Sequence, residues 1–452
     1  MSTLMKSVSG IRGIVGDTLT PELILAVGSA FAKFANKGLV VIGRDSRPTG
    51  EAVSLGMQSI LSLSGCDVVD LGIVPTPTVQ IMVEELKAAG GIVISASHNP
   101  IDWNAFKLID KTGSFLNAVQ IPKFFKLMEG SFKYPDFSGV GNIIKNTSAS
   151  DIHIKKVFSA VNTKKISEKK FKISLDSVNG AGSIITPDML KRLNCSIDPV
   201  YCEINGVFPR IAEPLPENLS ALSKAVIKNK SDIGFAQDPD ADRLAVVDEK
   251  GRPIGEEYTV ALVTEHLLAK KKGNVVVNLS TTRAVEDIAV KYGCKFFRSK
   301  VGEINVVEEM RKLGARIGGE GNGGVISPEI HLGRDSLAGI AYTLEMMAEK
   351  GKPISEIVAD LPQYVMKKGK VKYDPKKFGP EHIKKIKNMF KNEKISSIDG
   401  LRIDFEKHPE FKGGWVHLRA SNTEPVFRII TEGKNSEQAE IIYNSFSKLF
   451  VK

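Results

Sequence analysis

The chain has 452 residues, of which 42% are hydrophobic and 25% are charged, with a formal net charge of +10. These proportions are typical of a globular protein and exclude an intrinsically disordered or fibrous chain. A single hydrophobic core stops growing near roughly 250 to 300 residues, so we expect three or four domains.

The sequence also argues against a membrane-spanning protein and against a secreted one. No apolar run approaches the roughly 18 residues that a transmembrane helix needs, so we expect no membrane partner. The first residues, MSTLMKSVSGIRG, lack the apolar core of a signal peptide, and we expect a cytoplasmic protein. The four cysteines follow no metal-ligand spacing, and we expect no disulfides.

The positive charge raises the possibility of a nucleic-acid partner. The excess is diffuse, and its densest stretch, residues 367–394, has few aromatic side chains for stacking on bases. We interpret this stretch as a solvated linker and helix face and expect no nucleic-acid partner. A small anionic substrate would also suit a basic protein.

The first predicted unit is of the α/β type. It opens with SGIRG, in which Arg12 lies between glycines and can therefore approach a phosphate closely. A buried strand at residues 39–43 ends in RDSRPTG, a helical pattern follows to about residue 63, and a second strand covers residues 67–71.

Residues 91–95 form the central strand of this unit, and the chain then breaks into ASHNP. Pro100 disfavours helix at the residue before it, which places Ser97 and His98 in a turn at the end of a strand. Reactive groups of an α/β sheet usually lie at such strand ends, so Ser97 is a candidate nucleophile. The alternative is a serine-rich turn that only caps the next segment.

Strands followed by small-residue turns recur at residues 172–176, before SVNGAGS, and at 274–279, before STTRA. They indicate a second and a third α/β unit. The last segment has strands near residues 400–405, 415–420 and 427–431 and then a helix, the pattern of a small α+β domain. The expected domains are 1–150, 151–255, 256–368 and 369–452.

A strand at residues 233–237 leads into DPDADR. Asp238, Asp240 and Asp242 alternate and can face the same side, where a divalent cation would relieve their repulsion. Mg²⁺ is the expected ion, and a phosphate on Ser97 would complete its ligands. A calcium loop ending at Glu249 is the rival interpretation, but its sixth position is not glycine.

Two further loops carry polar groups. In GGEGNGG, residues 318–324, Glu320 and Asn322 offer acceptors for sugar hydroxyls or an amino group, although such a segment can also be a hinge. RASNTEPVFR places two guanidiniums and several hydroxyls beside one turn, which suits a phosphate, although a hairpin with surface arginines is the alternative. The residues concerned are Arg419, Ser421, Asn422, Thr423 and Arg428.

Taken in order, SASHNP, DPDADR, GEGNGG and RASNTEP resemble the phosphoserine, metal, sugar and phosphate loops of the α-D-phosphohexomutase family. The resemblance spans nearly the whole chain. It implies three mixed-sheet α/β domains around a central cleft, and a C-terminal α+β domain of the type found in TATA-binding protein. It also implies reversible transfer of phosphate between positions 1 and 6 of a hexose phosphate.

The resemblance implies a role for each loop. Ser97 would carry phosphate at rest, and that phosphate and the three aspartates would hold Mg²⁺. Lys107 and Arg12 would flank the transferred phosphate, with Lys107 as general acid or base, while His98 orients the loop. The Arg419 loop would grip the distal phosphate of the sugar, and Arg243 would also contact the substrate.

Two departures from the family pattern affect the sugar. Asn322 replaces the usual serine, and VGEINV at residues 301–306 lacks the TGH pattern of many phosphomannomutases and is closer to the loop of phosphoglucosamine mutases. With Glu303, Glu320 and Asn322 near the ring, we expect a preference for glucosamine phosphate, because carboxylates suit an ammonium group. A broad phosphomannomutase and phosphoglucomutase is the alternative.

A Mg²⁺-dependent phosphatase would also use a serine, three aspartates and an arginine cradle. Release of inorganic phosphate at every turnover would distinguish it from a mutase. The sequence leaves monomer and homodimer open.

Overall fold

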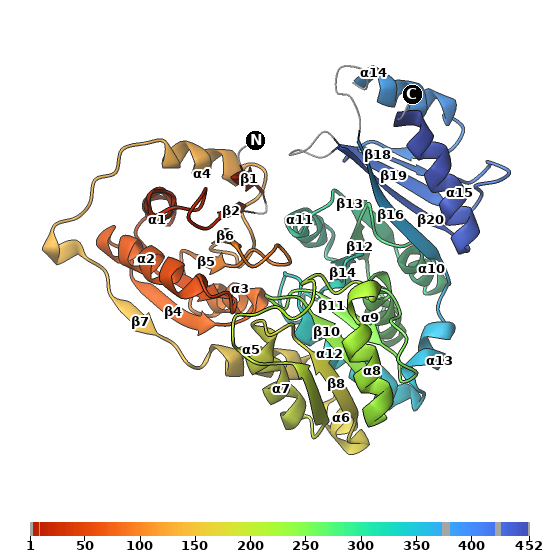
Figure 1. Cartoon of the computed structure of the whole chain (residues 1–452), viewed down its shortest axis with the longest axis horizontal. Helices are drawn as coiled ribbons and strands as arrows, with labels where there is room; N and C mark the ends of the chain where they lie inside the picture. The colour runs from red at the N-terminus through yellow and green to blue at the C-terminus, as the bar shows by residue number, and fades with distance from the viewer. Residues whose placement is uncertain (1–2, 9, 373–379, 421–425, 451–452) are drawn as a thin grey trace.

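The computed structural model describes residues 3–8, 10–372, 380–420 and 426–450. Four β-sheets follow one another along the chain. Figure 1 shows the parts that carry them in an arc, with the N-terminal sheet and the C-terminal sheet at its two ends. We call these parts domains I to IV. No helix of the described part is long and apolar enough to cross a membrane.

Domain I is built on a mixed seven-stranded sheet of order β1-β2-β6-β5-β3-β4-β7. Strands β5, β3, β4 and β7 are parallel, whereas β1, β2, β6 and β5 pair antiparallel. Central strands buried on both faces need continuous apolar runs, as in GGIVI of β5. Its elements are β1 Met5–Ser7, β2 Gly10–Ile14, α1 Pro21–Phe34, β3 Val40–Arg44, α2 Gly50–Leu63, β4 Val68–Ile73, α3 Thr76–Glu85, β5 Gly90–Ile94, β6 Trp103–Asp110, α4 Gln120–Met128, η1 Phe137–Gly139 and β7 Ile143–Lys145.

Domains II and III each have a four-stranded mixed sheet, of order β11-β10-β8-β9 and β13-β12-β14-β15. Domain II contains α5 Ala149–Ser159, α6 Thr163–Lys169, β8 Lys172–Asp176, α7 Gly182–Arg192, β9 Ser196–Tyr201, η2 Pro216–Asn218, α8 Ser220–Asn229, β10 Ile233–Gln237 and β11 Leu244–Val247. Domain III contains α9 Glu257–Lys270, β12 Val275–Asn278, α10 Ala284–Lys291, β13 Phe296–Ser299, α11 Glu303–Leu313, β14 Ile317–Glu320, β15 Gly324–Ile326, α12 Ser336–Lys350 and α13 Ile354–Ala359.

One hydrophobic cluster runs through both of these domains. It joins Leu175 and Phe235, on strands of domain II, to Leu262 of α9 and Tyr342 of α12 in domain III. Domains I and IV have clusters of their own. Domains II and III therefore form the fused centre of the molecule. Domain I has two clusters, one of which also includes Ala149 and Ile304, and domain IV has one.

Domain IV has a five-stranded antiparallel sheet of order β16-β20-β19-β18-β17, which α15 contacts at β20 and β16. Its elements are β16 Val365–Lys372, α14 Pro380–Met389, β17 Lys394–Ser396, β18 Leu401–Asp404, β19 Trp415–Ala420, β20 Val426–Gly433, α15 Ser436–Ser447 and η3 Lys448–Phe450. Three mixed α/β sheets and an antiparallel α+β domain confirm the expected fold class.

One expectation about this region is wrong. The sequence predicts a solvated linker and helix face for residues 367–394. The helix α14 lies within this stretch, but the first part of the stretch belongs to β16, which pairs with β20 along its whole length. Lysine is common on edge strands because it discourages further strand pairing, so the composition of an edge strand resembles that of a linker. β16 also spans the boundary expected at residue 368.

Candidate active site

A cavity of about 370 Å³ lies where the four domains meet. Side chains predicted from the sequence to act together line it: Arg12, Ser97, His98, Lys107, Arg243, Glu303, Glu320, Asn322, Arg419 and Arg428. Glu213, Arg334, Lys368 and His417 also line the cavity and were not predicted.

Ser97 lies three residues beyond the end of β5, in a turn where its φ is +51°. Its backbone N–H donates to Ser95 Oγ at 3.0 Å, and Ser95 Oγ in turn donates to Asp45 at 2.7 Å. The Ser97 hydroxyl donates to Asp238 Oδ2 at 2.9 Å. Ser95 thus serves as the capping residue of the turn, and Ser97 presents its hydroxyl to the metal loop.

The loop after Ser97 is held by a buried guanidinium that the sequence analysis did not single out. Arg47 donates to the carbonyl oxygens of Ser97, Asn99, Pro100 and Trp103 at 2.5 to 3.0 Å. Its Nε donates to Asp45 at 3.1 Å. The sequence feature that could have identified Arg47 as a functional residue is its position in RDSRPTG, where charged residues follow the buried strand β3.

Asp238, Asp240 and Asp242 lie between β10 and β11, fully buried, and can bring ligand atoms within 4.8 Å of one another. Asp240 Oδ2 contacts Lys107 and Thr76, and Asp242 Oδ2 accepts from Arg334 at 2.6 Å. Within the described part of the chain, the other oxygen of each of these two carboxylates has no hydrogen-bond partner. Each therefore keeps one buried oxygen that accepts no hydrogen bond from the described residues, although Arg243 Nε lies 3.7 Å from that oxygen of Asp242.

The electrostatics of the three aspartates favour a cation. Burial, followed by the charges of Asp242 and Asp240, raises the pKa of Asp238 well above its usual value. Burial raises the pKa of Asp240 as well, but Lys107, Thr76 and Arg334 together outweigh burial and lower that pKa. Clustered, buried carboxylate oxygens without partners fit Mg²⁺, which prefers oxygen ligands and few protein groups.

The calcium-loop alternative does not fit the structure. Glu249 lies beyond β11, and its carboxylate accepts hydrogen bonds from the hydroxyl and backbone N–H of Ser355 at 2.5 and 3.2 Å. It is therefore engaged away from the three aspartates.

Several cations surround the Ser97 hydroxyl. Lys107 comes from β6, and its Nζ also lies 3.7 Å from Asp242. Arg12 donates to Asn99 Oδ1 at 2.9 Å. Burial, and then the charges of Arg243 and Arg12, lowers the pKa of His98 to about 2, so its ring is neutral at ordinary pH. His98 Nδ1 lies 3.5 Å from Ser97 Oγ.

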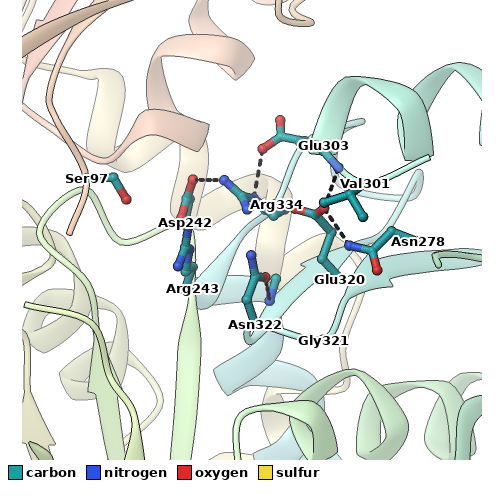
Figure 2. Close-up of polar contacts among 12 residues, drawn as sticks. Ser97, Asp242, Arg243, Asn278, Val301, Glu303, Glu320, Gly321, Asn322 and Arg334 are labelled. Atoms are coloured by element: carbon teal, nitrogen blue, oxygen red, sulfur yellow. Dashed lines mark hydrogen bonds and ion pairs between the residues drawn. The ribbon is translucent and has the colours of Figure 1, made fainter. Parts of the chain in front are cut away.

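The sugar-loop residues lie on the opposite wall. GEGNG forms a hairpin between β14 and β15, in which Glu320 pairs with Gly324, so the segment is not a free hinge. Glu320 and Glu303 both pair with Arg334, at 2.7 and 3.0 Å, as Figure 2 shows. Asn322 Oδ1 accepts from the backbone N–H of Gly324 at 3.2 Å and stabilises the turn.

On the side of domain IV, Arg419 and Arg428 are directly opposite each other on β19 and β20. Arg419 Nε donates to Asp399 at 3.1 Å. Like charges in register repel each other, so the pair favours an anion between them. The remaining predicted members of this loop, Ser421, Asn422 and Thr423, lie outside the described residues.

Comparison with known proteins decides the family. Models of the phosphoglucomutase/phosphomannomutase family match four successive segments: alpha/beta/alpha domain I at residues 4–132, domain II at 151–251, domain III at 255–365 and the C-terminal domain at 367–448. The chain belongs to the α-D-phosphohexomutase family.

Relatives of known name cover almost the whole phosphohexomutase chain. A probable phosphoglucosamine mutase of Methanopyrus kandleri is 33% identical over 97% of this chain and 96% of its own. A phosphoglucomutase/phosphomannomutase of Thermococcus kodakarensis is 36% identical over 95% of this chain and 94% of its own. The protein is therefore a phosphohexomutase, an isomerase that acts by intramolecular phosphate transfer.

Solved structures agree on the fold. A phosphoglucomutase/phosphomannomutase family protein of Burkholderia thailandensis has a TM-score of 0.83 and 26% identity, covering 98% of this chain and 97% of the other. A putative phosphomannomutase of Thermus thermophilus has a TM-score of 0.84 at 24% identity and covers 99% of both chains.

Proposed function

We propose that this phosphohexomutase interconverts glucosamine 6-phosphate and glucosamine 1-phosphate through a phosphoserine at Ser97, with Mg²⁺ held by Asp238, Asp240 and Asp242. The observation that carries the proposal is the Ser97 hydroxyl, 2.9 Å from a fully buried carboxylate of a cluster in which, among the described residues, two oxygens have no hydrogen-bond partner. A nucleophile held against a candidate cation site is the arrangement that phosphoryl transfer needs.

The chain's own residues then divide the work. The P–O bond to Ser97 breaks as a sugar hydroxyl forms its own bond to phosphorus, and the proton of that hydroxyl leaves to a base. Lys107 Nζ lines the cavity beside Asp240, and its unprotonated amine is the group assigned to take this proton and to return it in the reverse step. Arg12 neutralises phosphate charge, and neutral His98 orients the turn. Mg²⁺, when bound, stabilises charge on the transferred group.

The bisphosphorylated sugar must turn over before its other phosphate returns to Ser97. Arg419 and Arg428 line the same cavity from domain IV. We assign them to whichever phosphate is distal to Ser97, so that one site serves both halves of the cycle. Arg243, which pairs with Glu213 at 3.1 Å, contacts the substrate between them.

The sugar preference rests on charge. Glu303 and Glu320 share Arg334 with Asp242, so three carboxylates face one guanidinium. Glu303 and Glu320 line the cavity, where carboxylates suit the ammonium group of glucosamine, and Asn322 adds an amide on the same wall. A mutase of broad specificity for glucose and mannose phosphates is the second candidate, because the Thermococcus relative carries that name.

The proposed function is tested by intact mass and product analysis of the purified enzyme. We expect an added phosphate mass on the resting enzyme, and conversion of glucosamine 6-phosphate to the 1-phosphate with little inorganic phosphate. Stoichiometric release of inorganic phosphate would identify a phosphatase instead and overturn the mutase mechanism.

A further inference from the structure

Arg334 lies in the loop before α12 and reaches into the centre of the site (Figure 2). Each of its three side-chain nitrogens contacts a different carboxylate. Nε lies 3.0 Å from Glu303, Nη1 lies 2.7 Å from Glu320, and Nη2 lies 2.6 Å from Asp242. One guanidinium therefore joins the metal loop, the sugar hairpin and the first residue of α11.

The carboxylates that Arg334 holds are otherwise committed in ways that fix their orientation. Glu320 Oε1 accepts from Asn278 and from the backbone N–H of Gly302, at 2.7 and 2.9 Å. Glu303 Oε1 accepts from Gln80 at 2.9 Å. Asp242 Oδ1 has no hydrogen-bond partner in the described part of the chain. Arg334 thus occupies one oxygen of Asp242, whereas, among the described residues, the other oxygen has only Arg243 Nε at 3.7 Å and accepts no hydrogen bond from it.

The backbone that carries Arg334 is anchored by the two residues that follow it. Asp335 caps α12 through the N–H of Leu337 at 2.8 Å and contacts His153 of domain II at 2.9 Å. Ser336 Oγ donates to the carbonyl of Ala241, inside the metal loop, at 2.6 Å. A Cβ on Gly324 would come within 2.3 Å of Arg334 Cδ, so the hairpin packs directly against the side chain.

We infer that Arg334 is a positioning residue that sets the metal loop and the sugar hairpin with a single side chain, so that cation affinity and sugar affinity depend on the same guanidinium. The inference rests on the proposed function in one respect, the assignment of Asp242 as a ligand of Mg²⁺. A lysine has one nitrogen on a flexible stem and cannot reproduce three contacts in a fixed plane.

The test measures two dissociation constants separately on the full chain. Mg²⁺ is titrated calorimetrically without sugar, and glucosamine 6-phosphate, with mannose 6-phosphate as a second probe, is titrated in EDTA. Arg334→Lys and Arg334→Gln are expected to weaken both, Mg²⁺ by about 10- to 100-fold, the range for groups that orient metal ligands. Asp242→Asn should weaken chiefly Mg²⁺ binding.

Arg252→Lys is the matched control, because Arg252 pairs with Asp248 at the surface and should leave both constants unchanged. Thermal melts followed by circular dichroism establish that each variant is folded. Weakening of only one of the two affinities by the Arg334 variants would overturn the inference. A normal Mg²⁺ affinity in Asp240→Asn would instead overturn the aspartate site of the proposed function, which separates the two failures.

A second variant keeps the test open if the Arg334 variants do not fold. Glu320→Gln keeps the shape of the side chain but weakens the contact that fixes Arg334 Nη1, so the guanidinium orients Asp242 less well and Mg²⁺ affinity should fall by about threefold or more, within the range of coupled neighbours. Glu256→Gln is the control for this variant, because it removes a buried carboxylate that pairs with Lys368 and not with Arg334. It should not change the Mg²⁺ affinity. An unchanged Mg²⁺ affinity in Glu320→Gln would refute the coupling.

Discussion

The hydroxyl of Ser97 donates a hydrogen bond to Asp238 at 2.9 Å, although the two residues are 141 positions apart and belong to domains I and II. Thr76 and Lys107 of domain I also contact Asp240. The reactive centre therefore exists only when domain I is docked on the fused core of domains II and III.

Ser97→Ala should abolish the phosphate mass and lower kcat by at least about a thousandfold, since the nucleophile is removed. The measurement is intact mass combined with turnover. Ser95→Ala is the control: it should retain the phosphate mass but lose about 1 to 3 kcal/mol of stability, because Asp45 loses a buried donor. Phosphate mapped to Ser95, with Ser97→Ala still active, would contradict the assignment.

Asp240→Asn should weaken Mg²⁺ binding by at least about 100-fold and lower kcat more than it raises KM, because the charge acts on the transition state. The kcat is measured as a function of Mg²⁺ concentration. Asp248→Asn, a carboxylate beyond β11 that pairs with Arg252, should leave the Mg²⁺ dependence unchanged. A normal kcat and Mg²⁺ response in Asp240→Asn would remove the aspartates from the mechanism.

The sugar preference is tested by kcat/KM for glucosamine, glucose and mannose phosphates side by side. A charge-assisted hydrogen bond from the amino group, worth about 1.5 to 3 kcal/mol, would favour glucosamine by about tenfold to a hundredfold. Glu303→Gln should reduce that ratio. If mannose or glucose phosphate is preferred and the substitution leaves the ratio unchanged, the amino-sugar assignment is wrong and the mutase assignment stands.

Arg47→Lys should lower kcat by about 100-fold, because an ammonium cannot bond the four carbonyl oxygens that fix the Ser97 turn, and a displacement of about 1 Å at a reacting group has that effect. The KM for sugar should change little, since Arg47 does not line the cavity. Steady-state kinetics separate the two constants. Arg44→Lys, whose partner Glu51 is exposed, is the control. A raised KM at normal kcat would exclude a positioning role.

Domain IV should lose stability in mild acid through His417. Burial lowers the pKa of His417 to about 4, below the roughly 6.5 of an unfolded histidine. Between these values the unfolded state binds a proton that the folded state does not. Neutral His417 therefore makes its full contribution to the free energy of unfolding above pH 6.5. This contribution is lost as the pH falls towards 4, and about 2 kcal/mol is lost by pH 5.

The measurement compares the free energy of unfolding of His417→Gln and the parent at pH 7 and pH 5, followed by Trp415 fluorescence. Both proteins carry Trp103→Phe, because the chain has two tryptophans and only Trp415 should report. Trp415 is buried on β19 in the same domain. The parent should lose about 2 kcal/mol more than the variant over this interval. An equal loss in both would show that His417 does not titrate differently in the folded domain.

The sequence alone determined the elements whose signal is local. The buried run GGIVI followed by a proline-limited turn placed Ser97 at a strand end, and three alternating aspartates after another strand indicated a cation site. Each depends only on neighbouring residues, because strand burial and turn geometry are decided within a few positions of the chain. Four such loops in one order were also sufficient to recognise the family.

Only the tertiary structure decided which of these loops meet and which side chains hold them. Arg47 and Arg334 are single arginines without periodicity or motif, and their importance comes from carbonyl and carboxylate groups up to 92 positions away. The composition of β16 predicts a linker, because the strand is rich in lysine. Its strand structure comes from backbone pairing with β20, which lies far along the chain. Contacts between distant residues depend on how the domains dock. Docking is decided by whole packed faces, so no short stretch of sequence predicts it.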